Sequence, residues 1–103
     1  SEGINFGMKA GLNMEDVIEV ISKGAAQSWQ MDNRYKTMIE DKFEFGFAVD
    51  WMRKDLKIAL EEAKKNNSLL PITEIVDKYY DEVQQMGGNR WDTSSLIRRF
   101  KKK

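Results

Sequence analysis

The stretch from Gly46 to Leu60, GFAVDWMRKDLKIAL, predicts a long helix with two apolar faces. A helix turns by about 100° per residue, so its side chains can be sorted by face. A broad arc is typical of a core face and holds these residues: Ala48, Val49, Met52, Leu56, Ala59, Leu60 and Ala63. A second, narrower arc holds three: Phe47, Trp51 and Ile58. Lys54 borders the second arc, and Asp55 lies between the two. A small domain needs one apolar face on such a helix, so the second arc predicts a further contact.

Composition limits the classes of function. The chain has 103 residues, which corresponds to one domain. Its hydrophobic content of 41% and charged content of 33% are ordinary for a soluble globular protein. There is no cysteine and no histidine, which removes thiolate chemistry, the commonest general base and the commonest metal ligand. We expect a cytoplasmic protein without a metal site and without a membrane span.

Charge is balanced overall but unevenly placed. The chain carries 17 basic and 17 acidic residues, and five of the basic ones lie in the final hexapeptide, RRFKKK. We expect residues 98–103 to form a solvated basic tail. Such a tail can bind nucleic acid, but the rest of the chain is acidic, so a nucleic-acid-binding protein is the least favoured class.

Apolar spacing and helix-end residues predict an all-α fold of about six helices and no strand. Asn13 followed by Asp16 resembles a capping box, and Pro71 suits a first helical turn. Gly87 predicts a helix end, and Asp92 predicts the cap of a last short helix. The expected segments are residues 1–10, 14–23, 28–40, 47–65, 71–86 and 92–100.

Lys54 has two interpretations. A lysine beside an aromatic stripe ordinarily extends its ammonium group into water. Alternatively, it offers a cation to an anionic or polar ligand that closes over the apolar surface. Asp55 either pairs with a basic residue of a neighbouring helix or belongs to the same site. No phosphate-binding glycine loop and no calcium-binding loop occur in the sequence.

Three long stretches, in this order, resemble the C-terminal helical domain of the β-hydroxyacid dehydrogenases. They are AGLNMEDVIEVISKGAAQSWQMDNR at 10–34, DKFEFGFAVDWMRKDLKIALEEAKK at 41–65 and LPITEIVDKYYDEVQQMGGNRWDTSSLIRRF at 70–100. That family includes 3-hydroxyisobutyrate dehydrogenase and tartronate semialdehyde reductase, and it is related to 6-phosphogluconate dehydrogenase. The most specific motif is F-x-F-G-F-A-x-D-x-M-x-K-D-L at 43–56, supported by GxxxSWxxxNR at 24–34 and D-x-S-S-L-I at 92–97.

The resemblance implies a division of labour between two domains. Family members bind NAD or NADP on an N-terminal Rossmann domain, which is absent from this chain, and their catalytic lysine would precede Ser1. Residues 1–103 would then be a single helical domain, a fragment of a larger dehydrogenase that is inactive alone. By the same resemblance Lys54 contacts the cofactor, and Phe47 and Asp55 line the substrate side of the cleft. Asn33 matches a recurring family position without an assigned role.

The expected function is therefore to cover substrate and cofactor, and to support oligomerisation, in an NAD(P)-dependent 3-hydroxy acid dehydrogenase. Such an enzyme transfers hydride between a small 3-hydroxy acid and its semialdehyde. The expected partners are the missing Rossmann domain and further copies of the chain, which would partly bury Ile4, Phe6 and Met8. The alternative is a non-enzymatic helical protein-interaction domain that uses the second arc as a helix-docking groove.

Overall fold

The computed structural model describes residues 1–102, in which all regular secondary structure is helical apart from one isolated antiparallel bridge between Ala48 and Asp92. Five α-helices are followed by a 3₁₀-helix: α1 (Glu2–Lys9), α2 (Met14–Ile21), α3 (Trp29–Glu40), α4 (Val49–Asn66), α5 (Pro71–Gln85) and η1 (Thr93–Lys102). The all-α prediction with six helical segments is confirmed. No helix within residues 1–102 is long and apolar enough to cross a membrane.

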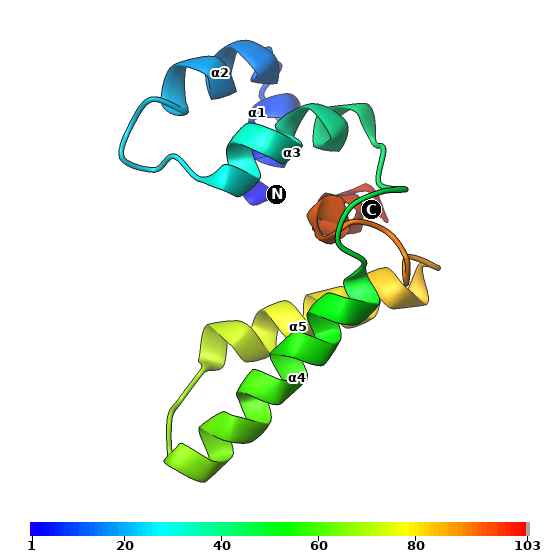
Figure 1. Ribbon diagram of the computed structural model, residues 1–103. Coiled ribbons are helices and arrows are strands. Elements are labelled where there is room, and N and C mark those ends of the chain that lie inside the picture. Colours follow the sequence, from blue (N-terminus) through cyan, green and yellow to red (C-terminus); the bar gives the residue numbers. More distant parts are fainter. Residues whose placement is uncertain (103) are drawn as a thin grey trace.

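The helices form two layers (Figure 1). Helices α1, α2 and α3 make up one layer, and α4 and α5 pack as an antiparallel hairpin that makes up the other. The 3₁₀-helix η1 lies between the layers, where it contacts α1, α3 and α5. The last segment of the chain therefore joins the two halves of the domain.

Local side chains cap the starts of α2 and α3, as predicted for Asn13. The Asn13 side-chain oxygen accepts a hydrogen bond from the Asp16 N–H at 3.2 Å, and the Ser28 hydroxyl oxygen accepts one from the Met31 N–H at 3.0 Å. Pro71 occupies the first turn of α5, where its missing N–H costs nothing. These partners are three residues apart or fewer, so their pairing needs no tertiary contact.

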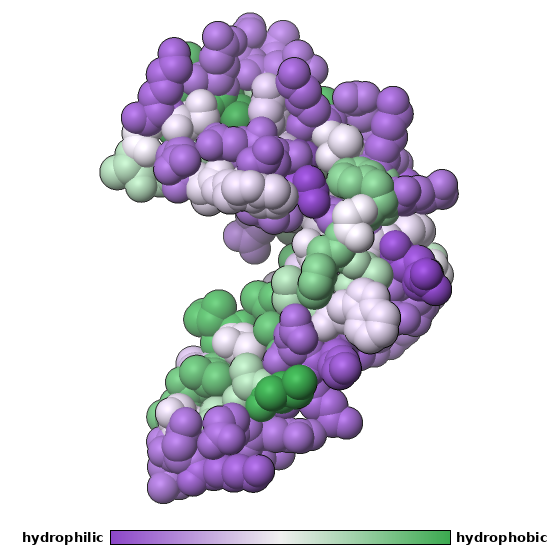
Figure 2. All heavy atoms as spheres, in the orientation of Figure 1, coloured by the Kyte–Doolittle hydropathy of each residue, from purple (hydrophilic) through white to green (hydrophobic). Residues whose placement is uncertain are grey.

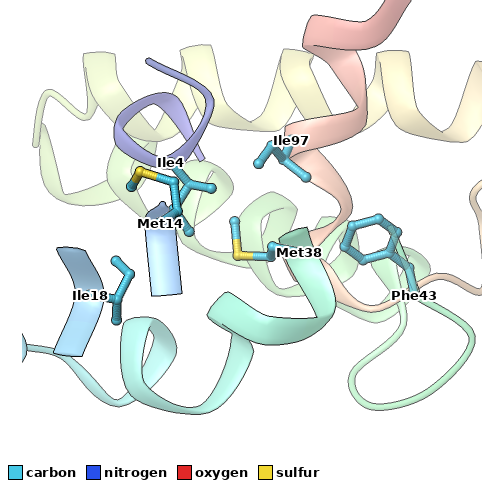
Figure 3. Packing of buried hydrophobic residues seen from close by; sticks show 6 residues of the cluster. All are labelled: Ile4, Met14, Ile18, Met38, Phe43 and Ile97. Atoms are coloured by element: carbon cyan, nitrogen blue, oxygen red, sulfur yellow. The ribbon is translucent and has the colours of Figure 1, made fainter. Parts of the chain in front are cut away.

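The core of the layer formed by α1, α2 and α3 is a cluster of buried apolar side chains that point toward one another (Figure 3). Its members are Ile4, Met14, Ile18, Met38, Phe43 and Ile97. Ile4 is thus buried by its own chain, which corrects the expectation that it awaits a partner. Phe6 on the same helix is 76% exposed, and Met8 is also exposed.

A second cluster fills the α4–α5 hairpin around the fully buried Val49 and Val83. The Tyr80 hydroxyl donates to the Thr93 carbonyl oxygen at 3.0 Å and so ties this cluster to η1. Burial, and then the nearby charge of Asp92, raise the pKa of Tyr80 to about 12. The predicted core arc is confirmed by the buried Ala48, Val49 and Ala63 and by the partly buried Met52, Leu56 and Leu60. Ala59 is exposed, so its inclusion was wrong.

The C-terminal residues do not form a solvated tail, which corrects that prediction for the residues 98–101. Arg98 pairs with Asp41 at 2.8 Å, and Arg99 pairs with Glu82 at 2.8 Å. Phe100 packs against the cluster that contains Ile4 and Met38, and the Arg99 guanidinium lies 3.5 Å from the centre of the Tyr79 ring. The guanidinium groups stack on aromatic rings as well as forming ion pairs, so this segment is bound to the domain. Lys103 lies outside the described residues.

Candidate functional site

The loop that precedes α4 is held in place by the loop that precedes η1. The Asp92 N–H donates to the Phe43 carbonyl oxygen at 2.8 Å, and the Thr93 N–H donates to the Phe47 carbonyl oxygen at 2.9 Å. Farther along, the Val49 N–H donates to the carbonyl oxygen of residue 91 at 2.9 Å. The backbone of Ala48 is extended, with φ −62° and ψ 141°, so α4 begins at Val49 and not at Phe47 as predicted.

Asp92 is the centre of this arrangement, and its side chain is fully buried. The carboxylate accepts hydrogen bonds from the Phe47 N–H at 3.0 Å, the Ser94 N–H at 3.1 Å and the Ser94 hydroxyl. It also pairs with the Arg34 guanidinium at 3.0 Å. Burial alone would raise the pKa of Asp92, but the hydrogen bonds from Ser94 and Phe47 and the charge of Arg34 outweigh it and lower the pKa. The predicted cap at the start of the last helix is confirmed, and the same carboxylate also binds Phe47 and Arg34.

Gly46 fits this network because it has no side chain. Its φ of +72° lies in the left-handed region, and a Cβ atom there would lie 2.2 Å from an Asp92 carboxylate oxygen. The same atom would lie 3.1 Å from an Arg34 nitrogen, and the Arg34 guanidinium lies 5.0 Å from the Trp29 ring centre and 5.1 Å from the Phe45 ring centre. The three motifs of the sequence analysis thus converge on one buried ion pair.

We call the contacts of Asp92 with Arg34, Phe47 and Ser94 the Asp92 clamp. It lies next to an open cleft beside the first two turns of α4, which we call the α4 cleft. It consists of two adjoining hollows. The larger, of about 540 Å³, is lined by Phe45, Phe47, Trp51, Arg90 and Trp91 among others. The smaller, of about 270 Å³, is lined by Asp50, Trp51, Lys54 and Arg90. Trp51 and Arg90 line both hollows, so the two lie side by side.

The second apolar arc of α4 stays uncovered by the described part of the chain. Phe47 is 44% exposed, Trp51 56% and Ile58 57%. In the space-filling view, apolar side chains interrupt the hydrophilic surface between the layers and beside the hairpin, whereas the far end of the hairpin is hydrophilic (Figure 2). The prediction of a second face that the domain itself does not need is confirmed.

The predicted site residues divide into two groups. Phe47 lines the larger hollow and Lys54 the smaller one, so both face the α4 cleft. The Lys54 ammonium lies 5.6 Å from the centre of the Trp51 ring. Asp55 is exposed on α4, outside the lining of both hollows. The Asn33 amide donates to the Trp29 carbonyl oxygen at 2.9 Å within α3, and Asn33 does not line the cleft.

The side chains that line the cleft are suited to binding a ligand. No group of three or more potential metal ligands occurs within residues 1–102. The cleft combines two aromatic faces with two cations, from Phe47, Trp51, Lys54 and Arg90. This combination suits a planar ligand that carries anionic groups.

Arg90 was not predicted from the sequence as a residue of the site. The signal for it was weak, a single arginine between the helix-ending Gly87–Gly88 pair and Trp91.

Comparisons with known proteins identify relatives in sequence and in fold. The chain is 64% identical over 102 residues to an uncharacterized oxidoreductase of Shewanella frigidimarina (strain NCIMB 400), covering 99% of this chain and 35% of that protein. It is 34% identical over 99 residues to 2-(hydroxymethyl)glutarate dehydrogenase of Eubacterium barkeri, covering 95% of this chain and 33% of that protein. The crystal structure of 3-hydroxyisobutyrate dehydrogenase (ygbJ) from Salmonella typhimurium shares the fold, with a TM-score of 0.85 at 24% identity over 94% of this chain and 34% of that one.

The chain spans about a third of the length of these curated relatives. Residues 1–100 match the family described as NAD-binding of NADP-dependent 3-hydroxyisobutyrate dehydrogenase. That description confirms the prediction of NAD or NADP as the cofactor of the family. The chain therefore belongs to the NAD-binding domain family of the 3-hydroxyisobutyrate dehydrogenases, as its motifs predicted.

Proposed function

We propose that this chain is the helical domain that covers cofactor and substrate in an NAD(P)-dependent 3-hydroxy acid dehydrogenase. In this proposal a Rossmann domain with the catalytic lysine precedes Ser1 in the whole protein, as the threefold greater length of the relatives suggests. The observation that carries the proposal is the exposed aromatic and cationic lining of the α4 cleft, with Phe47 just before α4 and Trp51 and Lys54 in its first two turns.

The placement of these residues supports a cofactor contact. Ligand sites form preferentially between domains, and a dinucleotide at the carboxyl ends of a Rossmann sheet faces whatever covers it. Phe47 and Trp51 would form an apolar wall, and Lys54 would bind an anionic or polar group of the cofactor. When bound, the nicotinamide would accept or supply the hydride. The covering domain would exclude water, which strengthens the contacts that Lys54 makes.

Asp55 would act at the margin of the substrate side. It lies four residues after Trp51, so the two side chains share one side of α4. A carboxylate there would accept hydrogen bonds from the upstream domain or from substrate hydroxyl groups. The proposed substrate class is a small 3-hydroxy acid or the corresponding semialdehyde.

Self-association and location are part of the same proposal. Phe6, Leu69 and Ile72 lie outside the α4 cleft and are 76%, 90% and 69% exposed. Apolar side chains this exposed are typical of surfaces that another copy of the chain covers. The absence of cysteine agrees with a cytoplasmic enzyme.

The test uses the whole protein that carries this domain. NADH and NADPH affinities are measured for wild type and Lys54→Ala, together with the turnover of 3-hydroxy acids. Loss of a charged contact costs about 1.5–3 kcal/mol, so the variant should bind cofactor about ten- to a hundredfold more weakly. Lys78→Ala is the matched control, because Lys78 is exposed on α5 and lines no hollow of the cleft.

The possible outcomes separate the hypotheses. Unchanged cofactor affinity in Lys54→Ala would assign the Lys54 ammonium to water. A wild-type protein that binds neither dinucleotide would reject the dehydrogenase proposal and favour the helix-docking alternative.

A further inference from the structure

Arg90 differs from the other arginines of the chain. Four of the five have carboxylate partners within 3.0 Å: Arg34 with Asp92, Arg53 with Asp77, Arg98 with Asp41 and Arg99 with Glu82. Across residues 1–102, Arg90 forms neither an ion pair nor a stacking contact with an aromatic ring, and it is exposed at the α4 cleft. A guanidinium group is well suited to bidentate binding of carboxylate or phosphate.

The backbone around Arg90 is fixed by the first turn of α4. The Asn89 carbonyl oxygen accepts from the Asp50 N–H at 3.0 Å, and the Trp91 carbonyl oxygen accepts from the Val49 N–H at 2.9 Å. The Asn89 side-chain amide also donates to the Asp50 carboxylate at 3.0 Å. Both neighbours of Arg90 are therefore anchored, and the cation has a defined place at the rim of the cleft.

The charges around Arg90 favour an anion. Lys54 lines the same small hollow, with Trp51 as their common neighbour. Asp50 is the acidic group of this hollow, but one oxygen of its carboxylate already accepts from Gln84 at 2.8 Å and from Asn89. Glu44 lines only the larger hollow, and neither Arg90 nor Lys54 pairs with a carboxylate within 4.0 Å in the described chain. Two cations thus share one hollow.

We propose that Arg90 and Lys54 form a two-cation site that binds an anionic carboxylate or phosphate group of a ligand lying against Trp51, and that Arg90 determines specificity for ligands that carry this group. The identity of the ligand rests on the proposed function, under which the anion belongs either to a phosphate of the dinucleotide or to a carboxylate of the substrate. The two-cation site itself follows from the geometry of the hollow alone.

The experiment uses the whole protein that carries this domain, as wild type, Arg90→Ala, Arg90→Lys and the control Lys78→Ala. Inorganic pyrophosphate is titrated into each by calorimetry at low ionic strength. NADH and NADPH affinities and the KM values of paired hydroxy acids with one and with two carboxylates are then measured. Arg90 is exposed, so its replacement should leave the fold, checked by circular dichroism, unchanged.

We expect Arg90→Ala to weaken at least one of these bindings tenfold or more, Arg90→Lys to restore part of the loss, and Lys78→Ala to have no effect. Weaker pyrophosphate and dinucleotide binding identifies the anion as a cofactor phosphate. A raised KM confined to the dicarboxylate identifies it as a substrate carboxylate.

Two results separate this inference from the proposed function. If wild type binds dinucleotide and turns over a hydroxy acid, but Arg90→Ala matches it in every measurement, the two-cation site is refuted and the proposed function stands. If wild type binds no dinucleotide, yet its pyrophosphate binding is lost in Arg90→Ala, the anion site stands and the dehydrogenase proposal fails. If neither dinucleotide nor pyrophosphate binds and no KM changes, both are refuted.

Discussion

Replacement of Asp92 by alanine tests the Asp92 clamp next to the α4 cleft. The substitution removes a fully buried carboxylate and leaves the N–H groups of Phe47 and Ser94 and the Arg34 guanidinium without their acceptor. Removing one partner of a buried ion pair costs about 3–5 kcal/mol, because the remaining charge and donors stay desolvated. The whole free energy of unfolding of a domain is about 5–15 kcal/mol, so Asp92→Ala should be near the limit of folding.

Tryptophan fluorescence reports this transition directly, since Trp91 precedes Asp92 and Trp29 stacks on Arg34. Urea unfolding is compared for wild type, Asp92→Ala and the control Glu62→Ala. Glu62 is exposed in the middle of α4, so its loss should change the free energy of unfolding by less than about 0.5 kcal/mol. A loss of less than about 1 kcal/mol in Asp92→Ala would refute the clamp.

A double-mutant cycle strengthens the test. Arg34→Ala removes the cation and leaves the Asp92 carboxylate with its three hydrogen bonds, so it should destabilise less than Asp92→Ala. Because the two side chains are in contact, the double variant should lose less stability than the sum of the single variants. Strict additivity would show that the ion pair contributes nothing to the clamp.

Three further predictions concern the same elements. Gly46→Ala should lower the free energy of unfolding by about 2–4 kcal/mol, because it adds a Cβ at a φ of +72° and against Asp92. The control Gly3→Ala should not lower it, because nothing lies within 4 Å of the added atom. Equal losses in the two variants would contradict the steric argument. Tyr80→Phe should cost about 1–2 kcal/mol in thermal unfolding, since it removes the buried hydrogen bond from the Tyr80 hydroxyl to the Thr93 carbonyl oxygen. An unchanged midpoint would refute that role. The pKa values of Asp92 and Asp41 are lowered in the folded protein, so the unfolded chain binds more protons in acid. The stability that these carboxylates contribute should be complete above their unfolded pKa of about 4 and should fall as the pH drops toward their folded pKa values. Urea unfolding at a series of pH values should show this slope, and the slope should be flatter in Asp92→Asn.

The parts of the site that could be predicted are those fixed by residues near one another in sequence. Trp51 and Lys54 are three residues apart on α4, so their common side follows from the geometry of one helix. Phe47 lies before the helix, and its backbone is held by pairing with residues 92 and 93. Arg90 could not be found in that way. It reaches the cleft only because residues 89–91 pair with the start of α4, some 40 positions earlier in the chain.

The failure of the tail prediction has the same origin. RRFKKK is highly charged, and charge alone predicts solvation. Arg98 and Arg99 instead meet Asp41 and Glu82 and lie against aromatic rings, which is visible only when the 3₁₀-helix is placed between the two layers.

Interactions within about one helical turn account for the all-α class, for the helix starts near Asn13, Ser28 and Pro71, and for the two apolar faces of α4, so these features could be predicted from the sequence. Only the packing of distant segments brings Arg34 and Asp92, 58 residues apart, into one ion pair, and places Arg90 with Lys54 at the cleft. Asp55 shares the predicted side of α4 and still falls outside the hollows. The physical reason is that a helix fixes the direction of a side chain, whereas its partners depend on how distant segments of the chain pack together.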